Sequence, residues 1–225
     1  MKYRTLGDNL ADVTTSNADV IRLLNRPFSA AASIVVLHGS LAPESAIVKP
    51  GLRPPDQPLR FVGTAVVYDD VPGAIAGVQK GELKPGGVLV LRGCGPKGGP
   101  AMAGSASRVV FAIYAAGLEN DCAFVSDGQL SGLCNKGLTI AEVSPESAVG
   151  GPLSLVENGD RIVVDVDART LDLDVPESEL AARRARRGEV LPAASTGYLS
   201  IYQRVVQPMS TGAVLLTRDA TRRLD

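Results

Sequence analysis

Residues 88–104, VLVLRGCGPKGGPAMAG, decide which kind of fold the rest of the chain has to fit. They begin as an apolar run typical of a buried strand, continue as a glycine-rich loop and end in small residues typical of a helix. Gly93, Gly95 and Gly98 spell G-x-G-x-x-G, the pattern of dinucleotide-binding loops. This order of strand, loop and helix predicts an α/β unit with a candidate ligand site in the loop.

The details of the loop do not favour a dinucleotide. Gly99 and Pro100 extend it beyond the third glycine, which in a dinucleotide site lies inside the first helical turn. Pro96 removes an N–H group where a phosphate would need a donor. The acid that binds the ribose should end the next strand about 20 residues on, and that strand ends later, at Asp127. We therefore expect this loop to serve other chemistry.

Hydrophobic patterning along the chain predicts more strands than helices, with strict alternation of the two only in the middle. Strands are expected within residues 31–39, 46–50, 60–70, 86–93, 122–128, 138–144 and 170–176, with 152–156 and 161–166 as an apparent hairpin around Asn158-Gly159. Helices are expected within residues 70–81, 101–117 and 177–188, with a weaker one at 17–24. We predict one α/β (α+β) domain over residues 1–225 with a barrel-like or two-sheet core, a lead-in at 1–30 and a tail at 188–225.

The composition excludes several classes of protein. Of the 225 residues, 45% are hydrophobic and 4% aromatic, so the chain folds around Val, Leu, Ile and Ala. The net charge of −1 leaves no basic footprint for nucleic acid or an anionic membrane. No apolar run approaches the roughly 18 residues of a membrane span. Three cysteines without C-x-x-C, and no apolar signal region at the start, indicate reduced thiols and a cytoplasmic protein.

Two glycine-rich turns follow two successive buried strands. The first is the loop quoted above, and the second is SDGQLSG, residues 126–132. Ligand sites of α/β proteins usually lie where the carboxyl ends of strands meet, so we expect these turns to converge there. Ser131 is then a candidate nucleophile or base. The alternative interpretation is an ordinary Asp-Gly turn with a polar serine.

Other polar residues have simpler explanations. His38, the single histidine, has no assignable Ser or Asp partner and is expected at a strand end. Four aspartates alternate with apolar residues, which permits a cation site but more commonly indicates a solvated sheet face; they are Asp165, Asp167, Asp172 and Asp174. The arginines within residues 183–187 are expected to form a solvated helix end. Cys122 is expected in the core.

Five motifs occur in a fixed order along the chain: GSLAPESAIVKP, GELKPGGVLVLRGCGPKGGPAM, SDGQLSG, VSPESAVGGPLSLVENGDRI and STGAVL. Together they resemble the C-terminal domain of the dihydroxy-acid dehydratase and 6-phosphogluconate dehydratase family over residues 5–215. The segment RGCGPKG is more similar to the sugar-acid branch than to the branched-chain biosynthetic branch. The resemblance implies a swivelling β/β/α domain with a barrel-like core and flanking helices.

The resemblance also implies part of a lyase of amino-acid biosynthesis or sugar-acid metabolism. Such a lyase dehydrates a 2,3-dihydroxy or sugar acid to a 2-keto acid. The catalytic base of the family falls on Ser131. The resemblance places the substrate-binding residues beside this serine, where they would bind the small anionic substrate. They are Lys97, Gly98, Gly99 and Asp127.

The cofactors that the resemblance implies lie elsewhere in the family, on an N-terminal domain that holds the iron–sulfur cluster and most Mg²⁺ ligands. We expect this chain to bind neither alone and to act when docked on a separately encoded N-terminal domain. One Mg²⁺ ligand of the family, a Glu two residues past the loop methionine Met102, is replaced by Gly104. The alternative function is a non-catalytic module that binds a small anion. No nucleic acid or membrane partner is expected, and a homo-oligomer is left open.

Overall fold

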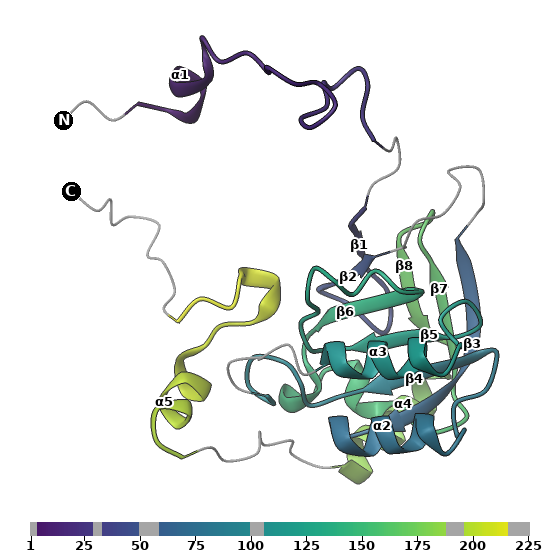
Figure 1. Cartoon of the computed structure of the whole chain (residues 1–225). Helices are drawn as coiled ribbons and strands as arrows, with labels where there is room; N and C mark the ends of the chain where they lie inside the picture. The colour runs from purple at the N-terminus through teal and green to yellow at the C-terminus, as the bar shows by residue number, and fades with distance from the viewer. Residues whose placement is uncertain (1–3, 29–32, 50–58, 100–105, 188–195, 216–225) are drawn as a thin grey trace. The chain divides into compact units, whose positions relative to one another are not determined.

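The computed structural model describes residues 4–28, 33–49, 59–99, 106–187 and 196–215 (Figure 1). The chain divides into two units, residues 1–32 and 33–225. In the first unit, helix α1 (Leu6–Leu10) carries a capping box between Thr5 and Asp8. The helix expected at 17–24 is wrong: these residues form turns. Their apolar side chains are exposed, so no packed face stabilises a helix.

Within its described residues, the second unit forms one eight-stranded sheet in the order β1-β2-β6-β5-β4-β3-β7-β8. The strands are β1 (Val35–Leu37), β2 (Ser45–Lys49), β3 (Arg60–Tyr68), β4 (Gly87–Leu91), β5 (Ala123–Ser126), β6 (Leu138–Ser144), β7 (Arg161–Asp165) and β8 (Thr170–Leu173). Strands β3 to β6 run parallel, and antiparallel strands flank them on both sides. Strands β4 and β5 are buried on both faces, which explains their continuous apolar sequences.

The sheet nearly closes on itself between its first and last strands. His38, just after β1, forms a parallel bridge with Thr170 at the start of β8. The Leu41 N–H donates to the Leu171 carbonyl at 3.2 Å, and the Ser40 N–H donates to the Asp172 carboxylate at 2.8 Å. The predicted α/β class with a barrel-like core is therefore confirmed, and His38 lies at a strand end as expected.

Helices cover the outer face of the parallel strands. Helix α2 (Val71–Gln79) and helix α3 (Ala106–Ala115) lie side by side over β4 and β5 (Figure 1). One apolar cluster fills the interior of the sheet, and a second lies between the sheet and these two helices. Helix α2 begins where the Asp70 carboxylate caps the Gly73 N–H at 2.7 Å. Its Pro72 suits the first turn, as expected.

The residues on the two sides of Asn158-Gly159 do not form the expected hairpin. Residues Pro152–Leu155 form the 3-10 helix η2, and the hairpin is β7 with β8. The turn at residues 157–160 instead contacts β3, because the Asn158 side chain accepts from the Val67 N–H and the Gly159 N–H donates to the Ala65 carbonyl. The expected strand at 152–156 was therefore wrong.

The C-terminal part of the chain contributes two further helices. Helix α4 (Glu177–Arg187) matches the expected helix, and helix α5 (Tyr198–Val205) lies in the expected tail. Short 3-10 helices η1 (Ser147–Val149) and η3 (Met209–Thr211) complete the described elements. The tail contacts the bend before β2, because Ser210 donates a hydrogen bond to Glu44 at 2.6 Å.

Candidate functional site

The carboxyl ends of the parallel strands bring several loops to one edge of the sheet. β3 is followed by residues 69–70, β4 by the glycine loop 92–99, β5 by the turn 127–137 and β6 by residues 145–146. The glycine loop and the turn touch: a Cβ built on Gly128 would lie 2.7 Å from the Cβ of Cys94. The predicted convergence of the two turns is confirmed.

Asp127, at the start of the turn, is fully buried and ties the glycine loop to the residues after β6. Its carboxylate accepts from the N–H groups of Gly93 at 3.2 Å and Cys94 at 2.9 Å. It also accepts from both the N–H and the hydroxyl of Ser147. These four contacts make Asp127 a residue that positions the loop. Its expected contact with substrate stays a prediction.

Glu146 holds the tip of the glycine loop. Its carboxylate accepts from the Lys97 N–H at 2.9 Å and the Gly98 N–H at 2.8 Å. Burial raises the pKa of Glu146 above its usual value, the N–H donors of Gly98 and Lys97 oppose this rise, and the charge of Asp127 adds to it. A Cβ on Gly95 would lie 2.5 Å from Glu146 Oε2, so glycine leaves room for the carboxylate.

The expected substrate-binding residues of the glycine loop therefore have partners within the chain. The N–H groups of Lys97 and Gly98 donate to Glu146, and the Gly99 N–H donates to the Gly95 carbonyl at 2.8 Å. Substrate binding by these residues stays a prediction. No role was expected for Glu146, although it lies two residues after the end of the predicted strand 138–144, where an acid reaches the same edge of the sheet.

A cavity of about 210 Å³ opens beside the glycine loop. Lys97 and Glu146 line it from the loop side, and Glu44, Pro208 and Met209 line it from the other elements. Hydrogen bonds from two serine hydroxyls lower the pKa of Glu44. The cavity is smaller than the roughly 300–1,000 Å³ pockets of drug-sized ligands, which suits a small molecule.

Ser131 lies on the exposed part of the turn after β5. Its Oγ accepts from the Leu133 N–H at 3.2 Å, and its N–H donates to Ser107 Oγ at 2.9 Å. The Lys49 ammonium group donates to the Ser131 carbonyl at 2.8 Å. The Leu133 N–H donates to the Ser131 hydroxyl, and the Lys49 ammonium group donates to the carbonyl of the same serine. Both contacts favour negative charge on Ser131. Lys49 was not among the expected residues because it lies far away in the sequence.

The described residues do not assemble a metal site. Among them, no group of three or more His, Cys, Asp and Glu side chains could hold a metal ion. Cys122 and Cys134 are buried, as expected for Cys122, and Cys94 is half-buried in the glycine loop. An iron–sulfur cluster therefore does not fit this part of the chain. Gly104, where the family carries a Glu, lies outside the described residues.

The four aspartates of β7, β8 and their turns contact protein groups, which favours a sheet-face role over a cation site. Their partners are Arg60 and the Ala168 N–H for Asp165, the Leu59 N–H for Asp167, the Ser40 N–H for Asp172 and Arg161 for Asp174. The expectation of a fully solvated arginine run on α4 is wrong for Arg183, whose side chain is only 10% exposed. Helix packing brings Arg183 against the Asp160 carboxylate.

The class of protein follows from these features: an α/β domain with a nearly closed barrel-like sheet and a loop-built site at the edge of its parallel strands. The chain belongs to the dihydroxy-acid/6-phosphogluconate dehydratase C-terminal family, whose model matches residues 19–213. It is 41% identical over 212 residues to a dihydroxy-acid dehydratase of Moorella thermoacetica, covering 94% of this chain. It is also 41% identical over 214 residues to a dihydroxy-acid dehydratase of Pyrococcus abyssi, covering 95% of this chain.

The chain spans 38% of the length of each of these relatives. The resemblance inferred from the five ordered motifs is thus confirmed as a relationship to the C-terminal region of the family. The relatives are named dihydroxy-acid dehydratases, and the similarity to the sugar-acid branch stays a prediction. In the part of the chain that the structure describes, no helix has the length and apolarity to cross a membrane.

Proposed function

We propose that this chain is the C-terminal part of a hydro-lyase that converts a 2,3-dihydroxy or sugar acid into a 2-keto acid and water. The observation that carries the proposal is the convergence of two loops of a dehydratase-family chain at one edge of the sheet. There Asp127 and Glu146 hold the glycine loop beside the turn that bears Ser131. We propose the cytoplasm as its location.

In the proposed reaction, Ser131 Oγ as an alkoxide takes the proton from C2 of the substrate. The C2–H electron pair forms the C2–C3 double bond, and the C3–O bond breaks. The departing hydroxyl takes the proton from Ser131 Oγ and leaves as water, which regenerates the alkoxide, and the enol tautomerises to the 2-keto acid. Serine is a weak base at its ordinary pKa, so the alkoxide needs stabilisation. The Leu133 N–H on Oγ and the Lys49 ammonium on the carbonyl support this role. The ammonium group of Lys97, a residue that lines the cavity beside the glycine loop, would attract the substrate carboxylate.

We propose that the iron–sulfur cluster and Mg²⁺ are supplied by a separately encoded N-terminal domain, equivalent to the part of the relatives that this chain does not match. The proposal is supported by the 38% coverage of the relatives and by the lack of a metal-ligand cluster among the described residues. When bound, the metals would supply Lewis acidity for the departing hydroxyl. Copurification from the native cells, followed by mass spectrometry, identifies the partner.

The role of Ser131 is tested by Ser131→Ala in the complete assembly of this chain with that domain. Removing a general base typically costs about 10²–10⁴ in rate, so we expect kcat for dehydration to fall by at least about 100-fold. The thermal midpoint should stay near that of the wild type, because Ser131 is exposed. Ser178→Ala, at an exposed position of α4, is the matched control and should keep full turnover. Unchanged turnover of Ser131→Ala would remove Ser131 from the mechanism.

The second candidate function is a non-catalytic module that binds a small anion. Gly104, in place of the Glu that the family carries there, favours it. This function predicts that the assembly binds a 2,3-dihydroxy carboxylate without producing a keto acid. Calorimetry together with a keto-acid assay on one preparation separates the two functions.

A further inference from the structure

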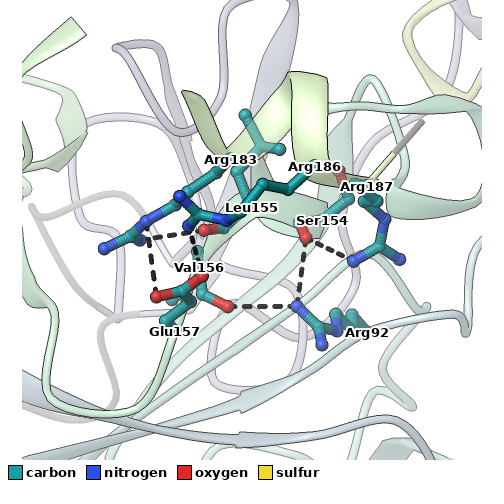
Figure 2. Close-up of a pocket in the computed structure, with 8 residues that line it drawn as sticks. All are labelled: Arg92, Ser154, Leu155, Val156, Glu157, Arg183, Arg186 and Arg187. Carbon is teal, nitrogen blue, oxygen red and sulfur yellow. Dashed lines mark hydrogen bonds and ion pairs between the residues drawn. The ribbon is translucent and has the colours of Figure 1, made fainter. Parts of the chain in front are cut away.

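A second pocket, of about 240 Å³, lies between η2 and the C-terminal turns of α4 (Figure 2). Four guanidinium groups line it, those of Arg92, Arg183, Arg186 and Arg187. The remaining lining residues are 154–157, of which Glu157 alone carries a carboxylate. Guanidinium groups present planar sets of N–H donors that match the oxygens of carboxylates and phosphates, so their concentration around one pocket indicates an oxyanion site.

The charges of three of these arginines are balanced by carboxylates. The pairs are Arg92 with Asp69, Arg183 with Asp160, Glu157 and Glu179, and Arg186 with Glu157 and Glu179. Arg187 has no ion pair with any carboxylate in the described part of the chain. The four carboxylates equal the four guanidinium groups in number, so the pocket has no excess charge. Arg187 is nevertheless an exposed residue that a ligand can reach.

Arg187 and Arg92 converge on one backbone oxygen. Arg187 donates to the Ser154 carbonyl at 2.6 Å, and Arg92 donates to the same oxygen at 3.1 Å (Figure 2). A guanidinium has five N–H donors, so most of those on Arg187 remain available to a ligand. Partial burial lowers the pKa of Arg187, the positive charge of Arg92 lowers it further, and the negative charge of Asp69 opposes both effects. An anion bound here would offset this repulsion.

Ser154, one of the residues that line the pocket, has a buried hydroxyl group. Its side chain is 2% exposed, and its Oγ has no hydrogen-bond partner among the described residues. Buried hydroxyl groups in folded proteins are almost always hydrogen-bonded, to protein, water or a bound ion. Ser154, which lines the pocket, thus carries a buried donor that no described residue uses, and its carbonyl already binds two guanidinium groups.

We propose that this pocket binds the phosphate group of a small ligand, with Arg187 as its main contact. Donors reach the pocket from β4 through Arg92 and from two successive positions of α4, Arg186 and Arg187. Donors arriving from several directions suit a tetrahedral oxyanion with acceptors in several directions better than a planar carboxylate. The volume suits a small ligand. The site is independent of the proposed dehydration, because it requires neither Ser131 nor a metal.

The test is calorimetric titration of the 225-residue chain with inorganic phosphate and, separately, with methyl phosphate, at constant ionic strength. We expect saturable binding with one site per chain. Arg187→Gln should weaken it by at least about tenfold, because a charge-assisted contact is lost. Arg184→Gln is the matched control on the same helix: Arg184 is 56% exposed and does not line the pocket, so its removal should leave the affinity unchanged.

Circular dichroism and thermal unfolding show whether each variant is folded. Arg187→Lys keeps the charge but loses the planar donor set, so its affinity should lie between wild type and Arg187→Gln. Binding of phosphate alone assigns a site for the free ion, and binding of both probes assigns a site for an esterified phosphate; each supports the proposal. No saturable binding to the wild type, or equal weakening by Arg184→Gln, overturns it.

Discussion

Glu146 places a carboxylate against successive N–H groups of the glycine loop. Tight glycine loops turn their N–H groups toward one point and so form a concave site for an anion. Here the anion belongs to the chain itself, 49 residues from Lys97 in sequence. The chain itself therefore holds the loop in shape, and the Lys97 side chain lines the cavity beside it.

The buried carboxyl of Glu146 should make stability depend on pH. Its pKa is raised in the folded state by burial, so folding binds a proton and the stabilisation is complete below the usual value of 4.5. That stabilisation is lost as the pH rises through the raised pKa. We expect the free energy of unfolding of wild type, minus that of Glu146→Gln, to decrease as the pH rises above 4.5, as measured by urea denaturation.

Asp12→Asn provides the control for this measurement. Asp12 is an exposed carboxylate in the unit of residues 1–32, so its removal should leave the pH dependence of unfolding as in wild type. A difference between wild type and Glu146→Gln that stays constant from pH 4 to pH 8, or increases, would show that burial does not control this carboxyl group.

At the scale of elements, Arg183 fixes α4 to the turn before β7. Its guanidinium contacts Asp160, Glu179 and the Leu155 carbonyl. The hydrogen bonds that Arg183 donates to the Asp160 carboxylate raise the pKa of Arg183, so it stays charged. Arg183 and Asp160 are 10% and 9% exposed, so replacing Arg183 would leave a buried carboxylate without its partner.

We predict that Arg183→Gln lowers the free energy of unfolding by about 3–5 kcal/mol, the usual cost of breaking a buried ion pair. Arg184→Gln, one residue further along α4 and paired at the surface with Glu177, should cost less than about 1 kcal/mol. Urea denaturation of the three proteins measures both changes. Equal losses in the two variants would mean that the Arg183 network contributes no more than a surface pair.

The elements show what local sequence can and cannot predict. The expected helix at 177–188 is observed as α4, because its acidic start and basic end are local signals. The pairing expected around Asn158-Gly159 was wrong, because an Asn-Gly turn does not specify which strand it will contact. In the structure the Asn158 side chain accepts a hydrogen bond from the N–H of Val67 in β3, which lies 91 residues away in sequence.

At the scale of the whole molecule, closure of the sheet depends on Gly39. Its φ is +152°, and a Cβ there would lie 2.3 Å from the Leu171 carbonyl oxygen. No side chain can occupy this position unless β8 moves away from the segment after β1. Because backbone groups of β8 pair with His38 and Leu41, such a movement would open the barrel.

We predict that Gly39→Ala lowers the free energy of unfolding by about 2–3 kcal/mol. Amide hydrogen exchange should become faster at Leu41 and Leu171, whose N–H groups bond across the closure. Gly132→Ala is the control, since nothing lies within 4 Å of a Cβ there. Protection unchanged at both amides would contradict the role of Gly39 in closing the sheet.

The sequence by itself determined the class of fold, the family and the two glycine-rich turns. Apolar runs, glycines and prolines determine the conformation of their immediate neighbours, and the order of the five family motifs can be read directly from the sequence. Only the tertiary structure decided which groups meet: Glu146 with the glycine loop, Lys49 with Ser131, and Arg187 with Arg92 across one carbonyl oxygen. These partners lie tens of residues apart, and their contacts depend on how the sheet curves and closes, which no local pattern encodes.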